Sequence, residues 1–311
     1  MTGKLVRMAA GSVAVHADAR PLARHALRRH ATSSPYPRRT RFLVGAVCVL
    51  VITVMLGPIA ASLLGSLKTP AEAAVSPPSY LPSVLSVENY IKVLHYQAGL
   101  LTYVFNSLAV GFLTICLCLT LAVTAGYGLA RFQLPCKELV FLVLLSALMI
   151  PYQMLLTPLY MELAKLGLAN THLGLAIVHT LLQLPFSIYL MRQSFEALPR
   201  ELEDAALVDG CNSLQMLWKV FLPSVTPALV TLMLFAFITS WNEFLAALIL
   251  MSKETMFTIP IMLVGVRQGH FGAVDWGALQ AGVVVSMLPC LLIYLLLQRY
   301  YVSGLLTGVA K

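Results

Sequence analysis

Charged residues are scarce in this chain of 311 residues, of which 11% are charged and 59% are hydrophobic. A typical soluble domain carries about 25% charged residues, so the composition excludes an ordinary soluble globular fold. The formal net charge of +8 would suit a nucleic-acid partner. However, the basic side chains concentrate in the first 41 positions, which hold nine Lys or Arg and one acid, instead of covering a polar surface. We therefore expect no nucleic-acid binding.

Signatures of catalysis and of metal binding are missing as well. The chain has no GxxxxGK[ST] phosphate loop and no HExxH or GxSxG motif. Its six cysteines show no CxxC or other metal spacing, and four of them lie inside apolar runs, which favours small apolar packing groups over a disulfide framework. We expect no catalytic residue, no metal site and no cofactor in this chain.

Long uncharged runs are abundant instead. The first covers residues 42–64 and is long enough to cross a hydrocarbon layer of about 30 Å as a helix. A cleaved signal peptide is the alternative for this run, but the long basic lead and the length of the run favour an uncleaved span. Five more runs predict an all-α membrane protein with six transmembrane helices: 101–130, 139–161, 166–191, 225–250 and 276–298.

The segments between these runs divide the chain into regions. Residues 1–41 cannot bury a core and are expected to form a basic, disordered cytoplasmic tail. Residues 65–100 are rich in proline and predict a loop on the extracytoplasmic side. A core of five spans is expected at 101–298, and residues 299–311 are expected to form a cytoplasmic C-terminus.

The distribution of Lys and Arg predicts the orientation, because these residues accumulate in cytoplasmic connections. With the N-terminus inside, the cytoplasmic segments carry sixteen Lys or Arg and the opposite side carries five. Both termini are therefore predicted to be cytoplasmic, as is the connection that contains residues 201–223.

Residues 201–223 form the most sharply punctuated polar segment after the tail. Acidic residues at positions 201, 203 and 204 suit the first turn of a helix, and Gly210 suits a left-handed helix end. Asn212 followed by Gln215 predicts a capping box at the start of a second helix. That helix would place Leu214, Leu217, Trp218 and Phe221 in one apolar stripe, with Pro223 at its end and Pro227 at the start of the next helix.

This segment resembles the EAA loop in permease subunits of binding-protein-dependent ABC importers. The EAA pattern has a Gly after three further residues and an I-x-L-P after nine more. Here the matching positions are Asp204-Ala205-Ala206, Gly210, Val220 and Leu222-Pro223, with Asp for Glu and Val for Ile as departures. The sugar-importer branch of this family is resembled by stretches such as YGLARF (127–132), WNEF (241–244) and QRYYVSGLLTG (298–308). The likeness covers roughly residues 85–311. One departure is Ser303, at a position where Arg is common in that branch.

The resemblance implies the type I ABC importer permease fold and a bacterial cell membrane location. It implies a second permease subunit as a heterodimer partner, two ATP-binding subunits that carry ATP and Mg, and an extracytoplasmic solute-binding protein. The loop at 199–223 would couple to the ATPase as a coupling helix. The residues implied in coupling are Glu203, Asp204, Ala205, Ala206, Asp209, Gly210, Leu222 and Pro223.

Glu243 is the only acidic residue inside the apolar runs. A charge within a bilayer is costly, so such a group normally faces a cavity or a partner. One interpretation places Glu243 in the lining of the translocation pathway with Asn106, Trp241 and Asn242. The other is that Glu243 pairs with the partner subunit. His residues in the fourth run are expected to be packed or interfacial groups and not proton relays.

Two other functions remain as alternatives. The same machine could carry a different solute, such as glycerol phosphate or another small polar molecule. An ion-coupled secondary carrier would instead require internal inverted repeats and a paired ionisable group at mid-depth, and the sequence displays neither.

Overall fold

The computed structural model describes residues 38–77, 79–267 and 274–309, and nearly all of them lie in helices joined by short connections. This confirms the all-α class predicted from the sequence. The chain divides into two compact units, Met1–Pro58 and Ile59–Lys311. Most of the predicted basic tail, residues 1–37, lies outside the described part of the chain.

Helix α2 (Arg38–Ser66) makes up the described part of the first unit and continues into the second. Its stretch Phe42–Ser66 is long and apolar enough to cross a membrane, which agrees with the first predicted span. The most apolar window of this helix has none of its residues buried. A surface of this kind suits contact with lipid, because lipid tails are as apolar as the side chains themselves.

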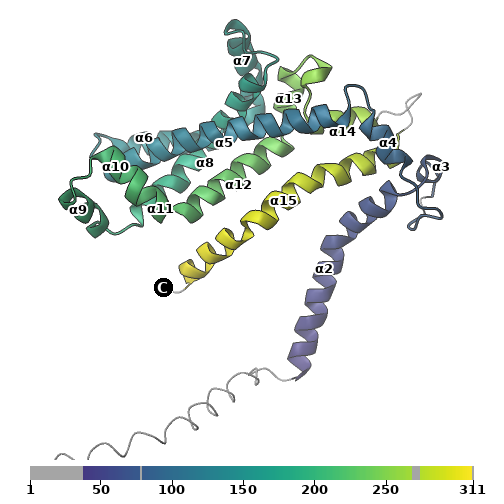
Figure 1. The fold of residues 1–311 in the computed structure, drawn as a ribbon, viewed down its shortest axis with the longest axis horizontal. Coiled ribbons are helices and arrows are strands. Elements are labelled where there is room, and N and C mark those ends of the chain that lie inside the picture. The colour runs from purple at the N-terminus through teal and green to yellow at the C-terminus, as the bar shows by residue number, and fades with distance from the viewer. Residues whose placement is uncertain (1–37, 78, 268–273, 310–311) are drawn as a thin grey trace, which may run out of the picture. The chain divides into compact units, whose positions relative to one another are not determined.

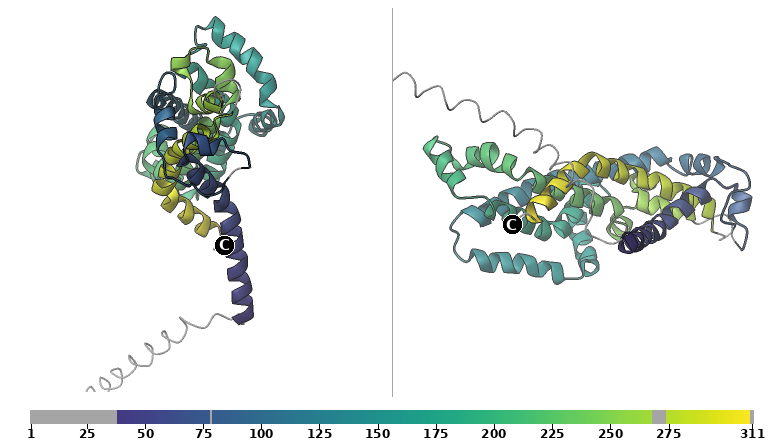
Figure 2. Two further views of the ribbon diagram at one scale, coloured as in Figure 1. Left: turned by 90° about the vertical axis from the view of Figure 1, so that its right-hand side faces the viewer. Right: turned by 90° about the horizontal axis from the view of Figure 1, so that it is seen from below.

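The centre of the second unit is a group of long helices that run side by side in Figures 1 and 2. These helices are α5 (Leu100–Arg131), α8 (His172–Glu196), α12 (Thr226–Asn242) and α15 (Trp276–Val309). Helices α5 and α8 make the most extensive contact. Their close approach depends on Gly126, because a Cβ at this position would lie 2.7 Å from the Cβ of Met191.

Four helices of the described residues can each cross a membrane by length and composition: α2, α5, α8 and α15. Two further pairs of consecutive helices qualify only if each bent pair counts as one span, which brings the total to at most six. The six spans predicted from the sequence therefore correspond to the upper end of this range.

The third predicted span, 139–161, is broken in the middle. Helix α6 (Lys137–Ser146) and a 3-10 turn over Ala147–Met149 are followed by α7 (Tyr152–Lys165), which is bent by 101° from them. The break falls at Pro151, whose ring favours an extended residue before it and removes a backbone N–H. Ile150 is indeed extended, with φ −79° and ψ 123°.

The fifth predicted span, 225–250, is also interrupted. Helix α12 ends at Asn242, and Glu243 has the extended backbone angles φ −71° and ψ 123°. The chain then resumes as the short helix α13 (Leu245–Leu250). At its other end α12 follows a bend of 82° after Ser213–Ser224, so the bent pair reaches into the segment predicted as a cytoplasmic loop.

Within the second unit, the C-terminal end of α2 is fixed to the connecting segment that contains α3 (Pro70–Ala73) and α4 (Glu88–Leu94). The buried amide of Asn89 donates to the carbonyl oxygens of Ser66 at 3.2 Å and Lys68 at 2.7 Å. Gly277 at the start of α15 leaves room for it, because a Cβ there would lie within 2.5 Å of the Asn89 amide oxygen. The region 65–100, predicted as a loop, thus contains two short helices and is hydrogen-bonded to the end of α2 through Asn89.

The return from α13 to α15 passes through a 3-10 turn, Glu254–Met256, and helix α14 (Ile259–Arg267). Figure 1 shows α4 and α14 at one end of the unit, whereas α9, α10 and α11 lie at the other. Helix α5 runs between the two ends, so residues near Leu100 and residues near Arg131 contact different sets of connections.

Candidate functional site

The segment that resembles the EAA loop begins with helix α9 (Glu201–Val208), whose first turn carries the three acids. Gly210 has a left-handed backbone with φ 77°. Its N–H donates to the carbonyl of Leu207 and the N–H of Cys211 donates to the carbonyl of Ala206, both at 3.0 Å. This pair of bonds is a Schellman motif, which confirms the prediction of a glycine helix end.

A second helix follows at once. Asn212 caps α10 (Ser213–Met216), with its side chain accepting from the N–H of Gln215 at 2.8 Å while the Gln215 side chain accepts from the N–H of Asn212 at 3.1 Å. The predicted capping box is therefore confirmed. Pro227 lies in the first turn of α12, also as predicted.

The rest of this second helix differs from the prediction. Residues Leu217–Phe221 form a π-helical turn, in which the N–H of Leu222 bonds to the carbonyl of Leu217, and α11 (Leu222–Ser224) continues beyond Pro223. The π-helical turn has more residues per turn than an α-helix, so it changes the directions in which side chains on either side of it point. The predicted single stripe is therefore divided: Leu217 and Phe221 are buried, whereas Leu214 is 65% and Trp218 64% exposed.

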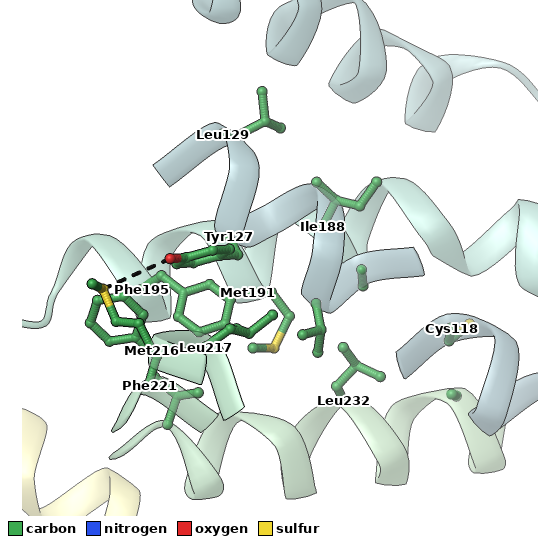
Figure 3. Close-up of a cluster of buried hydrophobic side chains, with 14 of the residues drawn as sticks. Cys118, Tyr127, Leu129, Ile188, Met191, Phe195, Met216, Leu217, Phe221 and Leu232 are labelled. Atoms are coloured by element: carbon green, nitrogen blue, oxygen red, sulfur yellow. Dashed lines mark hydrogen bonds between the residues drawn. The ribbon is translucent and has the colours of Figure 1, made fainter. Parts of the chain in front are cut away.

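Residues 199–223, called the coupling loop below, have a buried face and an exposed one. On the buried face Ala206, Met216 and Phe221 pack with Tyr127 of α5 and Phe195 of α8 (Figure 3). The exposed face mixes polar and charged groups with large apolar side chains, which include Leu207, Val208, Leu214 and Trp218. Exposed apolar groups gathered on a polar segment indicate a contact surface for another protein.

The residues implied in coupling occupy both faces. Asp204, Ala205, Asp209, Gly210 and Pro223 are exposed, Ala206 is buried, and Leu222 is half-buried. Glu203 is drawn inward, since a carboxylate oxygen lies 3.3 Å from Nη1 of Arg131 at the end of α5. Beside this pair is a polar cavity of about 260 Å³, lined by Arg131, Lys137, Arg200, Glu203 and Asp204 among others.

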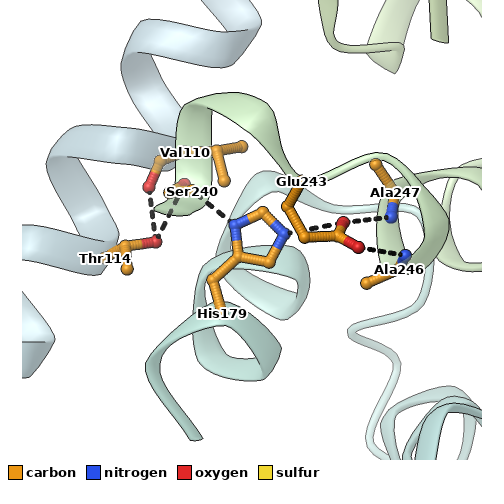
Figure 4. A network of polar contacts seen from close by, with 7 residues as sticks. All are labelled: Val110, Thr114, His179, Ser240, Glu243, Ala246 and Ala247. Carbon is orange, nitrogen blue, oxygen red and sulfur yellow. Dashed lines mark hydrogen bonds and ion pairs between the residues drawn. The ribbon is translucent and has the colours of Figure 1, made fainter. Parts of the chain in front are cut away.

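A second group of polar residues lies inside the helix bundle (Figure 4). The carboxylate of Glu243 accepts from the N–H groups of Ala246 at 2.8 Å and Ala247 at 3.0 Å, which caps the start of α13. One of its oxygens lies 3.3 Å from Nε2 of His179, in α8. The side chain of Glu243 is 8% exposed and that of His179 is 1% exposed.

The network continues from His179 toward α5. Its Nδ1 lies 2.8 Å from the hydroxyl of Ser240 in α12, and that hydroxyl accepts from Thr114 of α5 at 3.5 Å. The buried polar groups are thus joined in a chain across α5, α8 and α12, and they end at the break between α12 and α13. A chain of this kind holds the position of the break, because unpaired polar groups inside a bundle are costly.

The three other residues suggested for the pathway lie in different surroundings. The amide of Asn106 is 3% exposed and donates to the carbonyls of Thr255 and Phe257, both at 2.9 Å. The indole of Trp241 is buried and donates to the carbonyl of Ser286 in α15 at 3.1 Å. Asn242 is exposed. Asn106 and Trp241 therefore hold helices and loops together in this chain.

Three functional candidates were missed by the sequence analysis. Arg131 belongs to the YGLARF stretch, but nothing in its spacing indicates Glu203 as its partner. His179 is buried, as the prediction of a packed or interfacial group allows, but the sequence does not indicate its contacts with Glu243 and Ser240. Within the described residues no group of three or more His, Cys, Asp or Glu could hold a metal ion. All six cysteines are free thiols, and Cys118 is fully buried.

Comparison with known proteins gives a family and several relatives. The family described as "Binding-protein-dependent transport system inner membrane component" matches residues 54–306. The probable ABC transporter permease protein YurM of Bacillus subtilis is 36% identical over 231 residues, which are 74% of this chain and 76% of YurM. The sulfoquinovosyl glycerol transport system permease protein SmoH of Agrobacterium fabrum is 33% identical over 249 residues, 80% of this chain and 86% of SmoH.

A solved structure shares the fold. One chain in the crystal structure of a bacterial ABC transporter involved in the import of the acidic polysaccharide alginate superposes with a TM-score of 0.74 at 24% identity. The match covers 86% of this chain and 100% of that chain. At this level of identity the likeness concerns the arrangement of helices and not the solute.

Proposed function

Because this chain belongs to the binding-protein-dependent transport system inner membrane components, we propose that it forms, with a second permease, the pathway of an importer for a sugar or related polyol. The chain is a multi-pass cell membrane protein and a transport subunit, and ATP is hydrolysed by separate subunits of such systems. The observation that carries the proposal is the coupling loop, which presents large exposed apolar side chains on a segment whose other side packs into the core.

The exposed face is suited to dock on an ATPase subunit. Leu207, Val208, Leu214 and Trp218 lie around the glycine turn, with exposed fractions between 56% and 88%. The core of a protein interface is apolar and aromatic, with charge at its rim, and Asp204 and Asp209 would supply that rim. We assign coupling to this loop through Glu203, Asp204, Ala205, Ala206, Asp209, Gly210, Leu222 and Pro223.

Coupling of this kind transmits a change of shape. Closure of an ATPase dimer would displace the two loops docked on it, and the helices joined to each loop would tilt with it. Because α5, α8 and α12 are joined by packing and by the polar network, they would move as one body. The result is alternation between states open to one side and to the other.

The solute is proposed to be a saccharide. Support comes from the sulfoquinovosyl glycerol permease at 33% identity and from the sequence stretches that resemble the sugar-importer branch. We place Asn106, Trp241, Asn242 and Glu243 along the pathway. The exposed Asn242 would be available to sugar hydroxyls, and the buried Asn106 and Trp241 and the nearly buried side chain of Glu243 would be supports. Another small polar solute, such as glycerol phosphate, is the second candidate.

The assembly needs more subunits than this chain. We propose a heterodimer with a second permease, two ATP-binding subunits that carry ATP and Mg, and an extracytoplasmic solute-binding protein. The exposed apolar surfaces of the described helices leave ample area for the second permease as well as for lipid. A multi-pass chain of this kind would act in the bacterial cell membrane.

The test is uptake by cells that express the chain with its genomic neighbours. Cells would be given radiolabelled maltose, sulfoquinovosyl glycerol or glycerol 3-phosphate, and the same cells lacking this chain serve as control. We expect ATP-dependent accumulation of a saccharide and none of glycerol 3-phosphate. Accumulation of glycerol 3-phosphate alone would select the second candidate, and uptake that persists after ATP depletion would contradict an ATP-driven importer.

A further inference from the structure

Arg131 lies where the coupling loop meets the membrane helices. It is the last residue of α5, and its side chain is 7% exposed. Nη2 donates to the carbonyl oxygens of Phe195 at 2.7 Å and Leu198 at 2.9 Å, at the end of α8. Nη1 donates to the carboxylate of Glu203, in the first turn of α9, at 3.3 Å. One side chain at the end of α5 thus bonds to the end of α8 and to the start of α9.

Two more contacts connect the same end of α5 to the second half of the loop. The guanidinium carbon of Arg131 lies 4.8 Å from the centre of the Phe221 ring, in the π-helical turn. One helical turn earlier, the hydroxyl of Tyr127 donates to the carbonyl of Ser213 at 3.3 Å, where α10 begins. The end of α5 is therefore attached both to α9 and to the segment that leads into α12.

The chemistry of these contacts requires an arginine. Its planar group offers five N–H donors in fixed directions and can also stack on an aromatic ring, whereas a lysine ammonium is a point charge. The pair with Glu203 adds little stability by itself, because that side chain is 30% exposed. Its effect is directional, since it fixes how α9 is rotated against α5 and α8.

The two adjacent acids of α9 are used differently. Glu203 contacts Arg131, whereas Asp204 is exposed, makes no described ion pair, and lines the polar cavity beside them. Because residues on a helix are about 100° apart, rotating α9 to bring Glu203 away from Arg131 would also turn Asp204 and Leu207 away from their present directions. The orientation of the exposed face is therefore tied to the Arg131–Glu203 contact.

We propose that Arg131 is a positioning residue of the transport cycle, which holds α9 in a fixed orientation so that displacement of the coupling loop moves α5 and α8 together. Glu203 acts through Arg131 and does not contact the ATPase. This inference deepens the function proposed above and rests on it. It assigns to the end of α5 the transfer of movement from the loop to the bundle.

Arg192 provides a matched control within the chain. Its side chain is also 7% exposed, and it bonds to two carboxylates, of Glu138 at 2.7 Å and of Glu196 at 2.8 Å. Its guanidinium carbon lies 4.1 Å from the centre of the Phe141 ring. These described contacts join α8 to α6 and leave out the coupling loop. Arg192→Lys therefore removes a comparably buried guanidinium, as Arg131→Lys does, at a position whose described contacts do not include α9.

The test compares Arg131→Lys and Glu203→Gln with Arg192→Lys in the complete transporter reconstituted in lipid. For each complex we would measure the amount of saccharide imported per ATP hydrolysed, using the saccharide that the wild type imports. The thermal unfolding of each complex would be measured in parallel. We expect uptake per ATP to fall about two- to thirtyfold in Arg131→Lys and in the same direction in Glu203→Gln. Arg192→Lys should keep the wild-type ratio even where its thermal stability falls.

A second measurement does not depend on the solute. Spin labels at Gln133 and Glu201, introduced in a cysteine-free background, report the distance between the end of α5 and α9. We expect a broadened distance distribution in Arg131→Lys and Glu203→Gln and an unchanged one in Arg192→Lys. If Arg131→Lys fails to assemble, Glu203→Gln decides alone, because its partly exposed side chain is not needed for folding.

The outcomes separate this inference from the proposed function. A wild-type complex that imports no saccharide, with the distance broadened as expected, contradicts the proposed solute but supports the positioning role. Normal uptake per ATP together with an unchanged distance in both variants would overturn the positioning role and leave the importer intact. An equal fall of the ratio in Arg192→Lys would also overturn it, because the effect would then be one of stability.

Discussion

Among the described residues, Gly210 and Gly167 both have a left-handed backbone and open space around them, and they lie in different parts of the fold. Gly210 has φ 77° and ends α9 in the coupling loop, whereas Gly167 has φ 70° and follows α7. At both positions a Cβ would meet no atom within 4 Å. An alanine at either one therefore strains the backbone by roughly 1 kcal/mol without a steric clash.

This pair gives a prediction about coupling. In Gly210→Ala the strain alters the angle between α9 and α10, so the exposed face should fit the ATPase poorly. We expect normal membrane abundance with reduced uptake and reduced solute-stimulated ATP hydrolysis. Gly167→Ala carries the same strain and should transport like the wild type. Equal activities of the two variants in reconstituted complexes would show that the turn at Gly210 has no part in coupling.

The buried carboxylate of Glu243 gives a second prediction at the residue scale. It caps α13 and faces His179, so its replacement weakens both contacts. Loss of a helix cap typically costs about 1 kcal/mol, which the packed bundle should tolerate. Glu243→Gln should therefore assemble normally but lower uptake, because the break after α12 is held less firmly.

The matched control is Glu162→Gln. Its carboxylate also belongs to an ion pair, with Lys165 at 2.7 Å, but both side chains are 66% exposed. Uptake at saturating solute and subunit co-purification would be measured for both variants. Unchanged uptake in Glu243→Gln would leave the carboxylate as a cap of α13 without influence on transport.

Glu243 can be singled out from the sequence, but its partner His179 cannot. An acid in an apolar run is visible because of its cost in a membrane, whereas His179 lies 64 residues away and could be found only from the packing of α8 on α12. The same holds for Arg131 and Glu203, which are 72 residues apart. Local signals such as the capping box were predicted correctly because their partners are three residues apart.

At the scale of helices, the predicted apolar runs coincide with helices, but they do not predict where a helix is broken. The run 139–161 contains Pro151, so a bend there was foreseeable as a kink, yet a bend of 101° depends on the neighbours of α6 and α7. The break at Glu243 has no proline and arises because the carboxylate caps a new helix. Hydropathy measures how apolar a run is and contains no information about such caps.

The π-helical turn at Leu217–Phe221 leads to a prediction for this scale. Pro223 has no N–H to donate to the carbonyl of Lys219. In a regular α-helix its ring would also clash with that carbonyl. Pro223→Ala allows the narrower turn, which would rotate Trp218 relative to α12. We expect lower uptake per ATP with normal abundance.

The matched control for that variant is Pro227→Ala, in the first turn of α12, where a missing N–H leaves no bond unmade. It should transport as the wild type does. Both variants would be compared in reconstituted complexes by uptake and ATP hydrolysis. A wild-type ratio in Pro223→Ala would mean that the wide turn is incidental to coupling.

At the scale of the whole molecule, the structure and the charge count bear on topology in different ways. The described helices give four spans, or up to six if each bent pair counts as one span. The six spans predicted from the sequence are an even number, which would place the two termini on the same side. The charge count decides which side. Connections at the coupling-loop end and at the opposite end each carry five Lys or Arg, so the nine in the tail and two after residue 298 determine the excess.

Both termini are therefore predicted to be cytoplasmic, and a reporter enzyme active only outside the cytoplasm tests this. Fused after Lys311, the reporter should be inactive, whereas inserted after Lys253, between α13 and α14, it should be active. The second fusion confirms that the reporter can fold on this protein. Reversed activities would place the coupling loop outside the cell, where it could not reach an ATPase, and the proposed function would fail with the topology.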